Sequence, residues 1–364
     1  MTHTATQETT QATATRASEQ RDALQSAWRA LRETQPRLRI RNAAAMLGVS
    51  ELELLLTEPE DVVIRLQPAF TEIYPSLSLL GRIMTLARND EVVHETTGQM
   101  SKFSVMEGGR MGLCLGEIDL RVFFSHWGHA CAVTEAGPKG PRHSLQMFDH
   151  SGQAVHKVYA TGETDMAAWA ALVARFRAAD ADQRPALALQ PAPVFHRKPS
   201  LPDPQPLRDE WAAITDVHQF HDMLRRHGLD RLTALQQVGE PWARPVAQGS
   251  IESVLNSVAE IGTPIMAFVG NRGIVQIYTG RVHRLLSTGE WFNVLDPHFN
   301  LHMRTGEMTQ VWVVRRPSED GDITSLDAFN ADGELVLSLF GERKPGKAEL
   351  PAWRDLLAQI ETAS

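Results

Sequence analysis

The chain has 364 residues, a formal net charge of −8 and two cysteines, Cys114 and Cys131. This length suits two domains that each bury a core, while so few cysteines exclude a disulfide framework, a zinc ribbon or an iron–sulfur cluster. The acidic balance opposes sequence-independent nucleic-acid binding, which needs a basic surface. No run of about 18 apolar residues is present, so we expect no transmembrane segment and a cytoplasmic location.

The first 18 residues are rich in Thr, Ala and Gln and lack the apolar core of a signal peptide. Such a segment buries too little apolar surface to fold by itself. We therefore expect a disordered tail over residues 1–18, with the folded chain beginning at residue 19.

Helical patterns and then strand patterns follow in the first half of the chain. Residues 19–33 and 43–56 have the character of helices. Alternating β-branched and apolar residues then predict short antiparallel strands, at 92–95, 113–124, 130–134, 144–148 and 155–159. A helix that contains Trp169 closes this half.

A proline-rich stretch separates the two halves. Residues 185–206 contain seven prolines, and proline both fixes φ and removes a backbone donor, so this stretch is expected to be a linker. The order of elements then recurs over residues 207–364. Helices are predicted at 207–226 and 231–238, a strand at 274–278, and a closing helix around Trp353.

The chain is a tandem duplication with an offset of about 180 residues. The matching segments are 144–152 with 325–333, 83–89 with 265–271, and 28–32 with 211–215. This period exceeds the 20–50 residues or so of a solenoid repeat, so each copy is a whole domain. We expect an α+β fold in which each repeat, 19–184 and 207–364, forms a large antiparallel sheet with flanking helices.

Two histidines lie on a predicted helix that begins near Thr215 and ends at Gly228. His221 flanks the apolar stripe of this helix, and His218 lies at its rim. A rim imidazole beside an apolar floor suits an axial ligand to a metal held in an apolar cofactor. The alternatives are two ordinary, partly exposed histidines, or an i, i+3 zinc pair whose further ligands no HExxH or CxxC motif supplies.

The two repeats differ at the residues that bear chemistry. His218 aligns with Gln35, so this histidine belongs to the second repeat alone. Arg121 aligns with His302, so this arginine belongs to the first repeat alone. Arg121 shares a strand face with Asp119, and a surface ion pair between them is the alternative to a functional role.

Several segments of the chain together resemble one protein family. They are 119–123, 215–220, 268–273 with 275–277, and 324–326. In this order and spacing they resemble the HemS/HmuS/ChuS/PhuS family of bacterial cytoplasmic haem-trafficking and haem-degrading proteins. The likeness covers nearly the whole chain after the tail, including the duplication and the linker.

The resemblance implies roles for particular residues. His218 matches the family's axial haem ligand, and His221 matches an alternative ligand of some members. Arg121 matches the distal arginine, which would be catalytic if the protein is an enzyme. The residues implied to hold the haem propionates are Arg231, Arg316 and Arg343. Those implied to line the apolar pocket are Phe123 and Phe268. Two departures are Arg316 in place of lysine and Phe340 in place of tyrosine.

The implied function is binding of b-type haem, as ligand or substrate, for transfer or for oxidative degradation with iron release. Haem is a large apolar plate with two carboxylates, so its site needs apolar walls, an axial imidazole and basic residues at one edge. The implied partners are a haem oxygenase and the inner-membrane haem importer. Because each repeat lacks what the other supplies, we expect one haem per chain in a cleft between the halves. A module for a non-haem small ligand is the alternative.

Overall fold

The computed structural model describes residues 2–138, 140–181, 187–216, 219–344 and 346–361. The chain forms two compact units, and neither is a continuous stretch of sequence. Unit 1 comprises Met1–Ile83, Phe103–Gly112 and Phe123–Pro193. Unit 2 comprises Met84–Lys102, Leu113–Val122 and Val194–Ser364. Two segments of the first sequence repeat therefore belong to unit 2, and one unit boundary falls inside the proline-rich linker.

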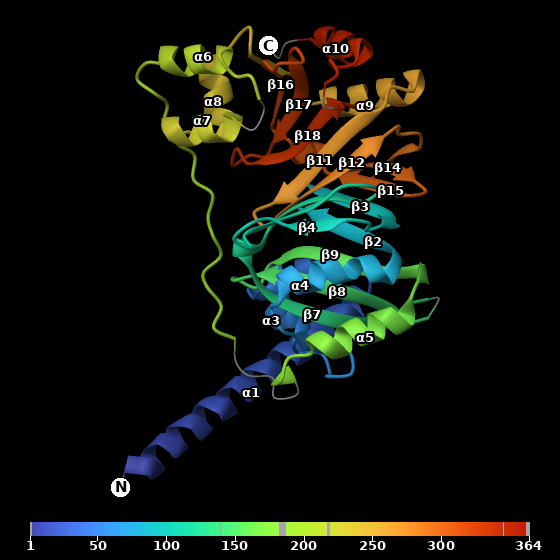
Figure 1. Cartoon of the computed structure of the whole chain (residues 1–364). Helices are drawn as coiled ribbons and strands as arrows, with labels where there is room; N and C mark the ends of the chain where they lie inside the picture. The colour runs from blue at the N-terminus through green and yellow to red at the C-terminus, as the bar shows by residue number, and fades with distance from the viewer. Residues whose placement is uncertain (1, 139, 182–186, 217–218, 345, 362–364) are drawn as a thin grey trace. The chain divides into compact units, whose positions relative to one another are not determined.

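The strands form two antiparallel sheets of nine, which confirms the α+β class and the large duplicated sheets (Figure 1). The first sheet has the order β1-β7-β8-β9-β2-β3-β15-β14-β13. Its strands are β1 (Val63–Leu66), β2 (Gly81–Arg88), β3 (Val92–Gln99), β7 (Trp127–Glu135), β8 (Arg142–Asp149), β9 (Ala154–Thr164), β13 (Leu285–Thr288), β14 (Trp291–Asp296) and β15 (Phe299–Met303).

The second sheet has the order β10-β16-β17-β18-β11-β12-β6-β5-β4. Its strands are β4 (Phe103–Val105), β5 (Met111–Cys114), β6 (Asp119–Phe123), β10 (Ala243–Val246), β11 (Ile265–Asn271), β12 (Ile274–Gly280), β16 (Gln310–Arg316), β17 (Ile323–Phe329) and β18 (Leu335–Gly341). Each sheet thus contains six strands of one repeat and three of the other.

The repeats exchange strands reciprocally. In the first sheet β3, from the first repeat, pairs with β15 from the second, and Leu301 lies opposite His94. In the second sheet β12, from the second repeat, pairs with β6 from the first, and Val275 lies opposite Arg121. Since β3 and β12 are counterparts, as are β6 and β15, the same junction is made twice.

Unit 1 contains five α-helices among its described residues, and the first of them begins earlier in the chain than the sequence predicts. They are α1 (Thr2–Thr34), α2 (Ile40–Leu47), α3 (Glu51–Leu55), α4 (Phe70–Ser76) and α5 (Met166–Phe176). The backbone of α1 is helical from Thr2, whereas the sequence predicts a disordered tail over residues 1–18. Alanine and glutamine favour helix whereas the threonines of this stretch do not, and no glycine or proline interrupts it, so its backbone continues the helix of residues 19–34.

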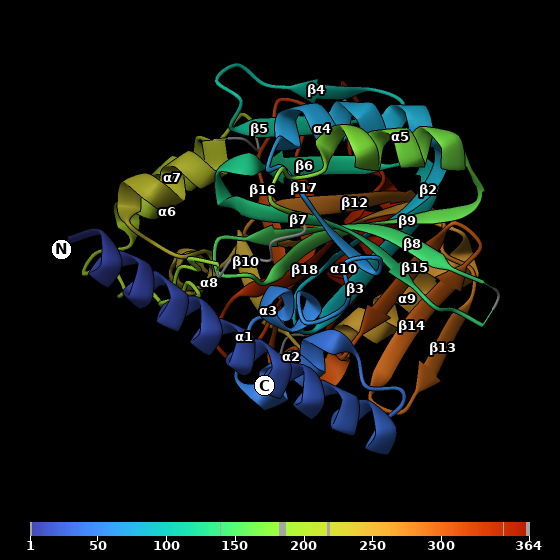
Figure 2. The same cartoon turned by 90° about the horizontal axis from the view of Figure 1, so that it is seen from below.

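Unit 2 contains α6 (Gln205–Ala212), α7 (Gln219–His227), α8 (Arg231–Val238), α9 (Ser250–Ile261) and α10 (Pro351–Ala358). Helices α6, α7 and α8 form one group in both views (Figures 1 and 2). They pack on one face of β16 and β17, where Trp312, Val314 and Phe329 share a core with α6–α8. Helices α9 and α10 pack on the opposite face, which contributes alternate residues such as Val311 and Leu326.

Unit 1 holds an aromatic cluster around Tyr74 of α4. Its hydroxyl lies 2.6 Å from His156 Nδ1, and its ring contacts Trp127 edge to face with centroids 4.9 Å apart. Burial raises the pKa of the Tyr74 hydroxyl well above its usual value. The phenol therefore stays protonated and serves as a structural hydrogen-bonding group in this core.

No helix among the described residues is both long and apolar enough to cross a bilayer. Residues 187–204 of the linker contain neither helix nor strand.

Substitution of Trp353 tests how α10 packs on the second sheet. The Trp353 side chain is fully buried, its Nε1 donates to the Thr324 carbonyl at 3.0 Å, and a Cβ on Gly341 would lie 2.8 Å from it. We expect Trp353→Ala to lower the free energy of unfolding by about 3–5 kcal/mol, because it leaves a large cavity. Urea unfolding measures this. The exposed Val194→Ala is the control, and a loss below about 1 kcal/mol in Trp353→Ala would contradict the assigned packing.

Candidate functional site

One face of the second sheet carries most of the residues singled out in the sequence. Directly opposite residues of antiparallel strands point to the same face, and strand register therefore defines a row across unit 2. The row runs through Asp119, Ile277, Phe268, Ser338, Asp327 and Trp312. Arg121 and Arg316 lie an even number of residues along their strands from members of this row, so they share the face. We call it the candidate face.

A buried ion cluster lies at the β16–β17 end of the candidate face. Arg316 Nη2 and Arg231 Nη1 lie 3.0 Å and 3.5 Å from the same oxygen of Asp327, Oδ2. Arg316 Nη1 also donates to Ser325 Oγ at 3.0 Å. The Asp327 carboxylate is completely buried, so two arginines predicted to hold propionates already share one internal anion.

Phe220 covers this cluster from α7. The guanidinium carbons of Arg231 and Arg316 lie 5.2 Å and 4.7 Å from the centre of its ring. Trp211 of α6 packs edge to face against the same ring. Phe220 therefore anchors the first turn of α7 over the arginines, through cation–π contacts that are stronger out of water.

One of the two predicted histidines lies in the first turn of α7. His221 is exposed, and its ring lies 5.9 Å from that of Phe220. His218 lies outside the described residues, as does the zinc alternative that depends on it. His221 is thus the described member of the pair that the family resemblance assigns to the haem iron.

The cluster has one more positive than negative charge. Burial lowers the pKa of Arg231 to about 10, Asp327 opposes this shift, and the nearby charge of Arg316 adds to it. Arg231 is still charged at neutral pH, but its charge is incompletely compensated. A further carboxylate beside it would restore the balance.

Unsatisfied polar atoms accompany this charge. Four buried atoms on the candidate face have no hydrogen-bond partner among the described residues: Arg316 Nε, Asp327 Oδ1, Ser338 Oγ and Trp312 Nε1. Three of them can donate, and buried polar groups are normally paired. The residues present therefore fit an acidic group better than they fit a purely apolar ligand.

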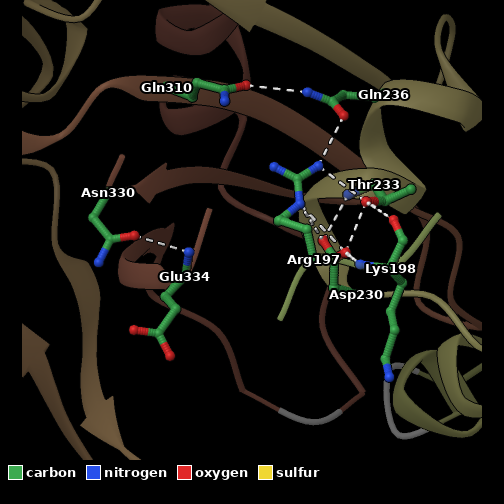
Figure 3. Close-up of polar contacts among 8 residues, drawn as sticks. All are labelled: Arg197, Lys198, Asp230, Thr233, Gln236, Gln310, Asn330 and Glu334. Atoms are coloured by element: carbon green, nitrogen blue, oxygen red, sulfur yellow. Dashed lines mark hydrogen bonds and ion pairs between the residues drawn. The ribbon is translucent and has the colours of Figure 1, made fainter. Parts of the chain in front are cut away.

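The end of the linker stabilises the helix that carries Arg231 (Figure 3). Asp230 caps α8 by accepting from the Thr233 backbone N–H at 2.9 Å, and it also accepts from the Lys198 backbone N–H at 2.7 Å. Arg197 forms an ion pair with Asp230 at 3.3 Å and donates to Gln236 Oε1 at 3.0 Å. Asp230 thereby fixes the first turn of α8 and with it the backbone of Arg231.

Arg121 lies at the other end of the candidate face and forms an ion pair with Asp119. Burial raises the pKa of the Asp119 carboxyl, and Arg121 acts in the opposite direction. The Arg121 side chain is 32% exposed, so the pairing expected as the alternative is present and the guanidinium remains accessible.

An apolar floor separates the two polar ends. Its centre is the edge-to-face pair of Phe268 and Phe340, whose ring centroids are 5.0 Å apart, and Ile277 extends it toward β6. Four strand spacings, about 19 Å, separate the strands of Arg121 and Asp327. An apolar plate with acidic groups at one edge matches this order of polar end, apolar floor and cationic end.

Two further predicted residues lie at the margins of this arrangement. Phe123 is the last residue of β6, two positions after Arg121, and so continues the alternation of the candidate face, but it begins a segment that belongs to unit 1. Arg343 follows β18, is half-buried, and has no ion pair with any residue that the structure describes. Neither is tied to the Asp327 cluster by a contact in the described chain.

Asp327 is the site residue that sequence reasoning missed. The signal was an acidic residue inside an apolar strand, between Leu326 and Ala328, where a carboxylate needs a buried partner. Its counterpart in the first repeat is Gln146, which is neutral. In unit 1 the corresponding helix start, Glu51, instead forms a buried ion pair with Lys157 of β9.

The comparisons with known proteins identify the family of the chain. The model of the haemin-degrading HemS/ChuX domain matches the chain twice, over residues 48–176 and 228–360. The chain belongs to this family.

Three relatives cover almost the whole chain. The hemin transport protein HmuS of Yersinia pestis is 37% identical over 322 residues, which are 88% of this chain and 92% of HmuS. The structure of holo-PhuS, a heme-binding protein from Pseudomonas aeruginosa, has a TM-score of 0.89 at 42% identity and covers 94% of this chain and 99% of PhuS. The Escherichia coli O157:H7 heme degrading enzyme ChuS has a TM-score of 0.86 at 35% identity, covering 93% of this chain and 98% of ChuS.

Asp327→Asn tests the buried cluster. It leaves two largely buried guanidinium groups without an anion, so we expect the free energy of unfolding to fall by about 3–5 kcal/mol in urea. Asp222→Asn is the matched control, because Asp222 pairs with Arg225 on the exposed surface of α7 and such pairs contribute about 0–1 kcal/mol. Equal stability of the two variants would show that Asp327 does not neutralise the arginines.

Proposed function

We propose that this protein binds one b-type haem per chain on the candidate face of unit 2. The observation that carries the proposal is the Arg231–Asp327–Arg316 cluster, which has an uncompensated positive charge and unsatisfied donors at the edge of an apolar floor. The family membership supports it independently.

The proposal assigns a separate task to each side chain. Arg231 and Arg316 attract the propionates, and Phe268 and Phe340 support the apolar ring. His218 is the axial ligand, with His221 as the alternative, and Arg343 and Phe123 make further contacts with haem. The iron supplies an axial position for imidazole and a second position for water, oxygen or another ligand.

Arg121 would contact whatever occupies that second position. A guanidinium stabilises developing negative charge where water is excluded, and its present partner Asp119 holds it on the correct face. Arg121 would be the catalytic residue if the bound haem is oxidised.

The charges of the first repeat support a single site. At the helix start that corresponds to Arg231, the first repeat has Glu51, and Lys157 neutralises it. Glu135 and Arg142 form a second ion pair nearby, with 2.6 Å between Glu135 Oε2 and Arg142 Nη2. These pairs leave no excess positive charge for a propionate, unlike the cluster in unit 2.

In the proposed function, the protein accepts imported haem from the inner-membrane importer in the cytoplasm. It then passes the haem to a haem oxygenase or degrades it. A non-haem ligand would need acidic groups of its own to neutralise the same cluster. Stoichiometric haem binding distinguishes the two.

Haem titration tests the ligand assignment. We expect a strong Soret band that saturates at one haem per chain, and a weakened or shifted band in His218→Ala because the imidazole is lost. His221→Ala is the matched control and should retain the wild-type spectrum. An unchanged spectrum in His218→Ala with a changed one in His221→Ala would exclude His218 as the main ligand.

Exposure of the anaerobically loaded protein to oxygen, with a physiological reductant and catalase, separates carrier from enzyme. For an enzyme, the Soret band disappears, a defined tetrapyrrole and free iron appear, and Arg121→Ala slows the loss at least about tenfold, as for removal of a charge-stabilising donor. For a carrier, the band is lost only when catalase is omitted, because free peroxide then attacks the haem.

A further inference from the structure

A pocket lies on the side of the second sheet opposite the candidate face, at its edge strand β10. It has a volume of about 280 Å³. Its lining includes Arg244, Arg315, Arg354, Glu240, Trp242 and Leu357. All of these residues belong to unit 2. Three arginines and one glutamate line the pocket, and the carboxylates of Asp322 and Glu349 lie beside two of those arginines.

This pocket is separate from the candidate face. Arg315 and Arg316 are neighbours on β16, and successive residues of a strand point to opposite faces. Arg316 binds Asp327 on the candidate face, whereas Arg315 lines the pocket. Thr324 and Ser325 on β17 are divided between the two sites in the same way.

The three arginines are held differently. Arg244 uses its two Nη groups as a brace, because they donate to the carbonyls of Ile360 and Leu357 at 2.9 Å and 2.7 Å. It therefore contributes charge to the pocket while it fixes the end of α10. The other two arginines are the candidates for direct contact.

Arg315 and Arg354 have donors to spare. Each has one carboxylate neighbour, at a distance longer than a normal hydrogen bond. Arg315 Nε lies 3.7 Å from Asp322, and Arg354 Nε lies 3.5 Å from Glu349. Both side chains are nearly half exposed. Within the described chain no acceptor is hydrogen-bonded to the Nη groups of either arginine, and planar Nη pairs are suited to bidentate binding of phosphate or carboxylate.

The remaining lining is apolar. Trp242 precedes β10 and lines the pocket, and its carbonyl accepts from the Arg315 backbone N–H at 2.7 Å, which holds the backbones of the two residues together. Leu357 of α10 and Val313 of β16 complete this wall. We propose that the pocket binds a small organic anion, with its phosphate or carboxylate on Arg315 and Arg354 and a flat apolar part on Trp242.

Isothermal titration calorimetry on the full chain, with no haem added, tests this site. The probes are phenyl phosphate, benzoate, inorganic phosphate and phenol. We expect saturable one-to-one binding of phenyl phosphate or benzoate with a Kd of about 1 mM or tighter, and at least about tenfold weaker binding of phosphate and of phenol. The stronger of the two aryl probes identifies the acidic group, and rising salt should weaken binding.

The variants Arg354→Gln and Arg315→Gln should each weaken that binding about tenfold or more, because each removes a charged donor. The control is Arg175→Gln, an exposed arginine of unit 1 that pairs with Glu72 and should bind like the wild type. Haem titration of the same variants should retain the Soret band and shows that they are folded. The proposal would be overturned if neither aryl probe binds saturably. It would also be overturned if a variant with both substitutions, Arg315→Gln and Arg354→Gln, binds the aryl probe as tightly as the wild type.

Discussion

A single buried carboxylate, that of Asp327, links the elements of the second repeat that form the candidate face. Two guanidinium groups cannot lie together in a core unless an anion lies between them, and the cost of burying each charge falls when it is paired. Asp327 supplies that anion from β17, while Arg316 comes from β16 and Arg231 from α8. Sheet and helix are thus joined by charge as well as by apolar packing.

The same pairing is incomplete by one charge, and this gives the face its chemistry. A fully neutral cluster, such as the pair of Glu51 and Lys157 in the first repeat, is satisfied without a ligand. The two copies of the sheet have therefore diverged at equivalent positions. The charges of the first copy neutralise each other, whereas the second copy has an excess of positive charge. Phe220 couples this excess to α7, the helix that carries His221.

Much of this organisation is predictable from the sequence, because periodicity and duplication are local properties. The helices, the strands and the repeat all follow from spacing that the residues themselves carry. The strand exchange does not, since an alternating pattern such as that of β6 defines which side chains share a face but not which strand lies alongside. For the same reason the family resemblance implies that Arg231 and Arg316 are basic residues near one edge of the site, yet not that both bind Asp327. That contact depends on residues 96 and 11 positions apart in the chain.

The reciprocal strand exchange has a consequence for how such a chain arises. A single repeat with this topology would leave the outer edges of its β3-type and β6-type strands unpaired, and exposed strand edges readily recruit further strands. Two identical copies could close both edges by exchanging these strands, with the two-fold symmetry usual for homodimers. Fusing the copies into one polypeptide keeps every strand pair but removes the symmetry requirement. Equivalent positions of the two repeats can then carry different residues, such as Arg121 and His302. Each half of the chain can therefore acquire its own role.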